Sequence, residues 1–236
     1  MPQRQNELGQ PIGEVVIGWE PVPHPSRTVL QGQYGRIEPL DVLTHVDDLF
    51  EAFATDQAGG LWTYMPVGPF ASVSELKDWM DESCTGDDPL FQAIIDEKSG
   101  KAVGIASYLR IRPEVGVIEV GNIVYSPMLQ RTRLATEAMY LMMSRVFDEL
   151  GYRRYEWKCD ALNAASRSAA RRLGFTYDGT FEQLTIYKGR NRDTAWFSIL
   201  DKHWPTIRIA FQAWLDPGNF DAQGQQKRSL SDCMPV

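Results

Sequence analysis

The spacing of hydrophobic residues changes several times along the chain and predicts a succession of strands and helices. From Tyr34 onward the pattern is regular. The segment RIEPL is typical of a strand that ends at Pro39, because proline removes a ladder donor. Asp41 can cap a helix running to about Ala54, since its apolar residues recur every three to four positions. An aromatic loop and a second helix follow.

Three apolar stretches then lie close together and are separated only by turn residues. They span residues 90–96, 102–111 and 117–125. The connections are too short for a crossover, so we expect an antiparallel meander. The period next changes to that of a helix over residues 132–150, which Gly151 ends.

The remainder of the chain alternates between the two patterns and ends in a polar stretch. The expected elements are a strand at 153–159, a helix at 163–173 capped by its first residue, strands at 175–179, 183–188 and 194–200, and a last helix from Trp204-Pro205 to Trp214.

Composition excludes several classes of protein. Of the 236 residues, 43% are hydrophobic and 23% are charged, which is ordinary for a globular protein, and the net charge of −7 offers no basic stripe for nucleic acid. No apolar run approaches the roughly 20 residues of a membrane span, and the first residues do not form a signal peptide. The three cysteines and three histidines are scattered, so we expect no disulfide framework and no metal site. These features predict a cytoplasmic protein without a nucleic-acid or membrane partner.

Three segments are expected from the distribution of proline, glycine and polar residues. Residues 1–33 are rich in Pro, Gly and Gln and predict an extended arm packed on the main domain. Residues 34–204 form the main domain. Residues 205–236 form a C-terminal helix and a mobile tail.

Three sequence motifs, in order, give this chain a family resemblance. They are VGNIVYSPMLQRTRLATEA, CDALNAASRSAARRLGF and KGRNRDTAWFSILDKHWP. Together they resemble the GNAT superfamily of N-acetyltransferases over roughly residues 34–204, and most closely the Rim-type branch that acetylates ribosomal-protein N-termini. The resemblance implies an α+β fold, the GNAT fold, whose central sheet is mixed, mostly antiparallel and splayed, with flanking helices.

The resemblance also implies that acetyl-CoA is the cosubstrate and that a loop and helix start hold its pyrophosphate. A helix N-terminus leaves backbone N–H groups unpaired and binds anions. The arginines of this loop add positive charge, although a capped helix with exposed arginines would look the same. Arg133 stands where the family usually has glycine, so the loop must manage there with negative φ. The predicted residues are Gln130, Arg131, Thr132, Arg133, Leu134, Ala135 and Thr136.

The strand before this loop has a role implied by the same resemblance. In the family the pantetheine arm fills a gap beside it, which assigns the backbone of Asn122, Ile123 and Val124 to the arm and to stabilisation of the oxyanion. The alternative is an ordinary central strand, in which Gly121 indicates a bulge or a close approach. Asn163 caps a helix in either interpretation, and the resemblance adds a contact with pantetheine.

Two residues are candidates for proton transfer. Glu119 lies in mid-strand, where a carboxylate needs a reason, and general-base catalysis is one and a surface ion pair another. Asp160 and Glu182 are weaker alternatives. The tyrosine that many family members use as proton donor is absent, because alanine occupies positions 169 and 170. Ser166 matches the Asn-x-x-Ser of the Rim-type branch, in which this serine is the proposed donor, and it could equally be an ordinary first-turn serine.

The leading hypothesis is acetyl transfer from acetyl-CoA to a primary amine by direct attack in a ternary complex. The acceptor, a small molecule or a peptide, is left open among a protein N-terminus, an amino sugar, a polyamine and an antibiotic, and the sequence also allows a homodimer. One alternative is a non-catalytic CoA-binding sensor or interaction module of the same fold. Another is a related transferase with a longer acyl donor.

Overall fold

The computed structural model describes residues 4–234 and contains one eight-stranded sheet, in the order β1-β2-β3-β4-β5-β6-β8-β7. Neighbouring strands pair antiparallel, except that β5 and β6 run parallel. The sheet is therefore mixed, as expected. The strands are β1 (Leu30–Gln31), β2 (Gly35–Pro39), β3 (Leu90–Asp96), β4 (Ala102–Arg112), β5 (Val117–Tyr125), β6 (Arg154–Asp160), β7 (Thr176–Tyr187) and β8 (Arg190–Leu200).

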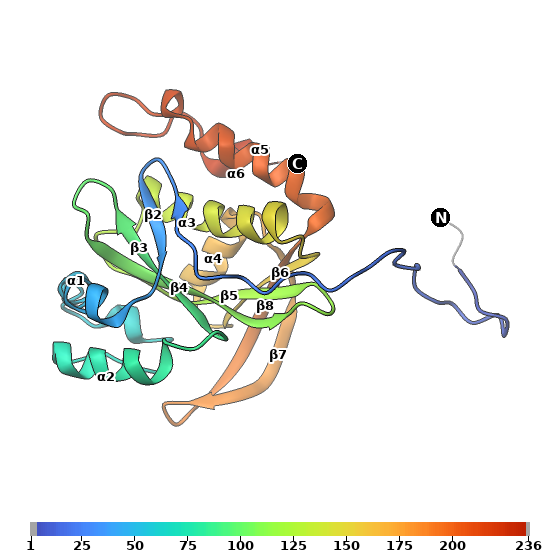
Figure 1. Cartoon of the computed structure of the whole chain (residues 1–236), viewed down its shortest axis with the longest axis horizontal. Helices are drawn as coiled ribbons and strands as arrows, with labels where there is room; N and C mark the ends of the chain where they lie inside the picture. The colour runs from blue at the N-terminus through green and yellow to red at the C-terminus, as the bar shows by residue number, and fades with distance from the viewer. Residues whose placement is uncertain (1–3, 235–236) are drawn as a thin grey trace.

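Helices cover both faces of this sheet (Figure 1). The first two pack on one face against β3 and β4, and the third and fifth pack on the other. A π-helical turn at Arg145–Glu149 prolongs the third helix to the length expected from the sequence. The helices are α1 (Val42–Ala54), α2 (Val73–Ser83), α3 (Arg133–Ser144), α4 (Ala164–Arg172), α5 (Trp204–Leu215) and α6 (Leu230–Cys233), with short 3₁₀ turns at Gly60–Trp62, Asp201–His203 and Pro217–Asn219.

Polar caps explain where the helices begin. Asp41 accepts a hydrogen bond from the Thr44 N–H at 2.8 Å, and Asn163 accepts one from the Ser166 N–H at 3.0 Å. Each side chain satisfies a backbone donor that has no partner within its helix. Both caps were predicted from the sequence and are confirmed.

The last part of the sheet differs from the sequence expectation. Two separate strands were predicted at 175–179 and 183–188, but β7 is continuous and pairs with β8 along its length. The register shifts between Phe181 and Thr185, and Gln183 takes a φ of 52°. A bulge of this kind bends a strand without ending it, which is why the polar interruption was misread as a break.

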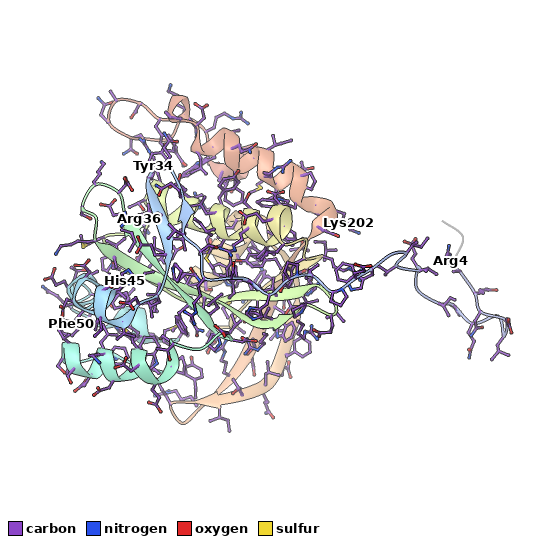
Figure 2. All side chains as sticks on the ribbon, in the orientation of Figure 1. Arg4, Tyr34, Arg36, His45, Phe50 and Lys202 are labelled. Atoms are coloured by element: carbon purple, nitrogen blue, oxygen red, sulfur yellow. The ribbon has the colours of Figure 1, made fainter. Side chains whose placement is uncertain are left out.

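Both ends of the chain also differ from the expectation. Residues 4–18 extend away from the sheet, with Arg4 far from it in Figure 2. The arm therefore packs on the domain only from Trp19 onward, where the indole Nε1 donates to the Glu114 carbonyl at 2.9 Å. Residues 216–234 fold back on α5 and bury Phe220 and Leu230. The three-segment division itself stays a prediction.

Candidate active site

A cleft of about 1620 Å³ crosses the middle of the sheet and contains every predicted cofactor-binding and catalytic residue and the alternative base Asp160, whereas the other alternative, Glu182, does not line it. It joins three features that lie far apart in the sequence. These are the N-terminus of α3, the edge of β5 beyond its pairing with β6, and the start of α4. The cleft therefore brings the predicted cofactor residues and the predicted catalytic residues into one continuous space.

The middle of the cleft is opened by the divergence of β5 from β6. Their registered pairs end at Val120 and Trp157, although β5 continues to Tyr125. A bulge sits just past this point, where Asn122 has a φ of 50° and its side-chain amide donates to the Ser107 hydroxyl at 2.9 Å. The bulge expected next to Gly121 is thus present, and β5 lacks a β6 partner over Asn122, Ile123 and Val124.

The loop before α3 takes a positive φ at a different residue from the one where the family usually has glycine. Arg131 takes the positive φ, 60°, while Arg133 is already the first helical residue. Thr132 caps the helix by accepting from the Ala135 N–H at 3.1 Å. Arg133 therefore has a negative φ, as predicted, and its side chain is free to leave the loop.

Glu119 lies on the floor of the cleft and is almost completely buried, with 3% of its surface exposed. Its Oε1 accepts from Arg110 Nη1 at 2.7 Å, and its Oε2 lies 2.6 Å from Lys158 Nζ, close enough for an ion pair but without good hydrogen-bond geometry. Lys158 also reaches Glu156 at 3.0 Å and lies 3.7 Å from the centre of the Trp196 ring. The ion pair considered as the alternative role of Glu119 is thus present, but as part of a buried network rather than on the surface.

Burial and charge act in opposite directions on these carboxylates. Burial raises the pKa of Glu119 above its ordinary value, and the nearby Lys158 and Arg110 only partly offset it. For Glu156 the hydrogen bonds from Arg154 and Lys158 outweigh desolvation, so its pKa is lowered. Of the two carboxylates, Glu119 therefore has the higher affinity for a proton, which suits a group that accepts a proton during turnover.

Ser166 lies in the first turn of α4 and faces the same cleft. Its Oγ accepts a hydrogen bond from the Trp157 indole Nε1 at 3.0 Å. This contact uses an oxygen lone pair and does not itself consume the hydroxyl proton. The geometry is compatible with both interpretations of Ser166 made from the sequence.

Comparison with known proteins decides the family. The Acetyltransferase (GNAT) domain family matches residues 36–176, more than half of the chain. The chain belongs to the GNAT acetyltransferases. A GCN5-related N-acetyltransferase from Brucella melitensis is 48% identical in sequence, with a TM-score of 0.90 over 92% of this chain and 98% of that one. The N-acetyltransferase p20 of Bacillus licheniformis, itself uncharacterized, is 28% identical over 60% of this chain and 80% of its own length.

Rim-type relatives are more distant from this GNAT chain. An acetyl transferase from Salmonella typhimurium that modifies the N-terminal serine of a ribosomal protein is 18% identical, with a TM-score of 0.60 over 73% of this chain and 99% of that one. At this identity the likeness shows the fold alone. The family and fold are therefore established, and membership of the Rim-type branch is not.

The sequence analysis did not identify Lys158, which lines the cleft of this GNAT protein, or Glu156, which pairs with Lys158. Glu156 and Lys158 alternate along β6 with Tyr155 and Trp157, which face the hydrophobic core. A strand with polar residues at every second position has a polar face. That alternation in YEWKCD was the available signal, but the pairing of β6 with Glu119 on β5 depends on a parallel contact between distant segments.

A contact between distant segments encloses the side of the cleft away from α3. Lys188, at the turn between β7 and β8, donates to the carbonyls of Trp62 and Gly68 at 2.8 and 3.2 Å. Tyr187 donates to Asp160, which lines the cleft, at 2.8 Å. The hairpin is thereby tied to the loop between α1 and α2.

Within residues 4–234, every helix is too short or too polar to span a lipid bilayer. The same residues contain no group of three or more His, Cys, Asp or Glu side chains arranged to hold a metal ion.

Proposed function

We propose that this protein transfers an acetyl group from acetyl-CoA to a primary amine by direct attack in a ternary complex. The observation that carries the proposal is the cleft itself. It connects a helix N-terminus flanked by arginines, an unpaired strand edge and a buried carboxylate. These are the three parts that a thioester donor and an amine acceptor need.

The residues of the cleft fit acetyl-CoA. The N-terminus of α3 offers backbone N–H groups and partial positive charge to a diphosphate, and Arg131 adds a full charge. The edge of β5 over Asn122–Val124 has no β6 partner, so its backbone is available to an extended amide chain. Acetyl-CoA supplies an activated acyl group that forms a carbon–nitrogen bond as its carbon–sulfur bond breaks.

The cleft also supplies groups for the oxyanion and for the two proton transfers of the reaction. Backbone N–H groups of the β5 edge would stabilise the oxyanion that develops at the attacked carbonyl. Glu119 would take the proton lost by the amine through water, and Ser166 would give its hydroxyl proton to the leaving thiolate and recover one from solvent. Asn163 would support the site by holding the first turn of α4 at Ser166.

The acceptor stays a proposal at the level of a primary amine on a small molecule or a peptide. The tie between Lys188 and the α1–α2 loop confines the approach on that side. An extended peptide N-terminus or a small amine fits such an opening better than an amine on a folded surface. This constraint is compatible with a Rim-type acceptor and does not select it over a polyamine or an amino sugar.

One observation favours the second candidate, a CoA-binding module without catalysis. Both carboxylate oxygens of Glu119 lie close to cations, Arg110 and Lys158. A base held in this way must exchange a partner for the acceptor or its water before it can act. If it does not, the site binds CoA and performs no transfer.

An acceptor screen separates the two candidates. Wild-type protein and acetyl-CoA would be mixed with peptides, polyamines, amino sugars and aminoglycosides, following release of free thiol, while calorimetry measures acetyl-CoA binding. Thiol release that depends on one class of amine supports the transferase. Binding without thiol release for every class supports the module, and absence of binding contradicts both.

A further inference from the structure

The C-terminal segment Pro217–Gln226 forms one wall of the cleft, although it lies well beyond the family-matched residues 36–176. In Figure 1 the chain after α5 passes over the side of the sheet on which α3 lies. Phe220 and the backbone around Gly224 face the cleft beside the start of α3.

The segment is held in a defined conformation. The Trp214 indole Nε1 donates to the Gln226 side chain at 2.8 Å, and the Asn219 side chain donates to the carbonyls of Trp214 and Arg228 at 3.0 and 3.1 Å. Phe220 pairs with Gln226 in a β-bridge and packs edge-on against Trp214, with ring centres 5.2 Å apart. These contacts fix the segment in place, so it forms an ordered wall of the cleft.

This wall positions the guanidinium of Arg133. Its Cζ lies 3.8 Å from the centre of the Phe220 ring and 5.4 Å from that of Tyr34. Tyr34 is itself fixed, because its N–H donates to buried Glu137 at 2.7 Å and its hydroxyl donates to the Leu215 carbonyl at 3.1 Å. Aromatic faces attract a guanidinium and leave its N–H edges free to donate.

The guanidinium of Arg133 is available to a ligand because it forms no ion pair within the described residues. In the part of the chain that the structure describes, no carboxylate lies within 4.0 Å of its nitrogens. Two acidic residues do line this end of the cleft, but Asp96 accepts from Ser99 and Glu97 pairs with Arg36 at 3.7 Å. The Arg133 guanidinium is therefore held in place by two rings and keeps its charge for a ligand.

We propose that Phe220 and its segment hold Arg133 for recognition of the 3′-phosphate of CoA, an assignment that rests on the proposed function. The acyl end belongs at the unpaired edge of β5 and the diphosphate at the N-terminus of α3. The Arg133 side chain leaves that terminus towards Phe220, where the remaining phosphoadenosine end would lie. Phe220 is then a positioning residue, and Arg133 is the residue that contacts the phosphate.

Binding of two ligands that differ by a single phosphate tests this assignment. Calorimetry would compare CoA with 3′-dephospho-CoA for wild type and Arg133→Ala. We expect Arg133→Ala to weaken CoA binding by about 10- to 100-fold, the range of charge-assisted hydrogen bonds, and to leave dephospho-CoA binding nearly unchanged. The loss should shrink with added salt. Equal losses for both ligands would overturn the assignment to the 3′-phosphate.

Matched variants of Phe220 test the part played by the wall. Phe220→Leu keeps an apolar side chain but removes the π face, so CoA binding should weaken roughly 2- to 10-fold, whereas Phe220→Tyr keeps the ring and should bind like wild type. In the double variant with Arg133→Ala, the leucine should add nothing, because Phe220 acts through the arginine.

Failure of this assignment can be told apart from failure of the proposed function. Full additivity, or a Phe220→Leu protein with wild-type affinity for CoA and a normal melting temperature, would remove the segment from cofactor recognition. A wild-type protein that binds neither ligand would instead contradict the proposed function.

Discussion

Replacing Lys158 by methionine tests whether the buried ions beneath the cleft are a balanced unit. Methionine keeps much of the side-chain volume and removes the charge that lies 2.6 Å from Glu119 and 3.0 Å from Glu156. The side chains of these three residues are 8%, 4% and 7% exposed, so water cannot replace the ammonium easily.

The size of the effect follows from which partners remain. Removing one member of a buried ion pair typically costs about 3 to 5 kcal/mol. Glu119 keeps Arg110 and Glu156 keeps Arg154, at 2.7 and 2.6 Å, which places the expected loss at the lower end, about 3 kcal/mol. For a chain of this length that is a fall in melting temperature of about 6 to 12 °C at pH 8.

The loss should depend on pH with a definite sign. Burial already raises the pKa of Glu119, and removal of Lys158 raises it further. A carboxyl whose folded pKa exceeds its unfolded value binds more protons when folded, so the protein gains stability as pH falls through the folded pKa. The deficit of the variant relative to wild type should therefore shrink between pH 8 and pH 5.

Thermal melts at both pH values measure this deficit, and Lys77→Met is the matched control. Lys77 pairs with Asp81 on the surface of α2, where both side chains are at least 40% exposed, so its removal should leave the melting temperature unchanged at either pH. A Lys158→Met deficit of the same size at pH 5 and pH 8 would refute the charge explanation and point to packing. A deficit as small as that of the control would refute the network altogether.

Three further predictions concern ligand binding and catalysis. Acetyl-CoA at a hundredfold excess over its dissociation constant should add about 2.7 kcal/mol of stability and raise the melting temperature by roughly 5 to 11 °C; no shift in a thermal melt at millimolar acetyl-CoA contradicts the cofactor assignment. Glu119→Gln should lower turnover by about 10²- to 10⁴-fold with acetyl-CoA affinity intact, and a wild-type rate from pH 6 to pH 9 would make Glu119 structural. Ser166→Ala should slow the single-turnover chemical step without changing cofactor affinity, and unchanged rates would leave Ser166 as a helix residue.

Helix caps and short turns could be predicted from the sequence, because the residues that form them are close together in the chain. Asp41 and Asn163 begin helices by accepting hydrogen bonds from residues three positions on, so a short window contains the whole interaction. The short turns of the β3–β5 meander were readable for the same reason. The family resemblance then supplied what no local pattern contains, namely that α3 follows a strand that diverges from its neighbour.

The buried ion pairs of the site could not be predicted from the sequence, because they join residues on different strands of the sheet. Glu119 was selected as a strand carboxylate, yet nothing near it in sequence shows that Lys158 lies 2.6 Å away. That contact requires the parallel register in which Glu119 faces Glu156. Parallel strands are joined by long crossovers, so their register depends on packing over the whole intervening helix.

The departure of the cofactor loop from its family and the C-terminal extension have one common explanation. An arginine in place of glycine at residue 133 gives up the backbone freedom of glycine, and the loop instead takes its positive φ at Arg131, 60°. The long cationic side chain of Arg133 lines the cleft, where, unrestrained, it would lose conformational entropy on binding a ligand. Phe220 restrains it in advance from a segment that the family match does not include. Under the proposed recognition of the 3′-phosphate, this preorganisation makes Arg133 a specificity element, and Arg133 and Phe220 are expected to contribute to CoA binding only together.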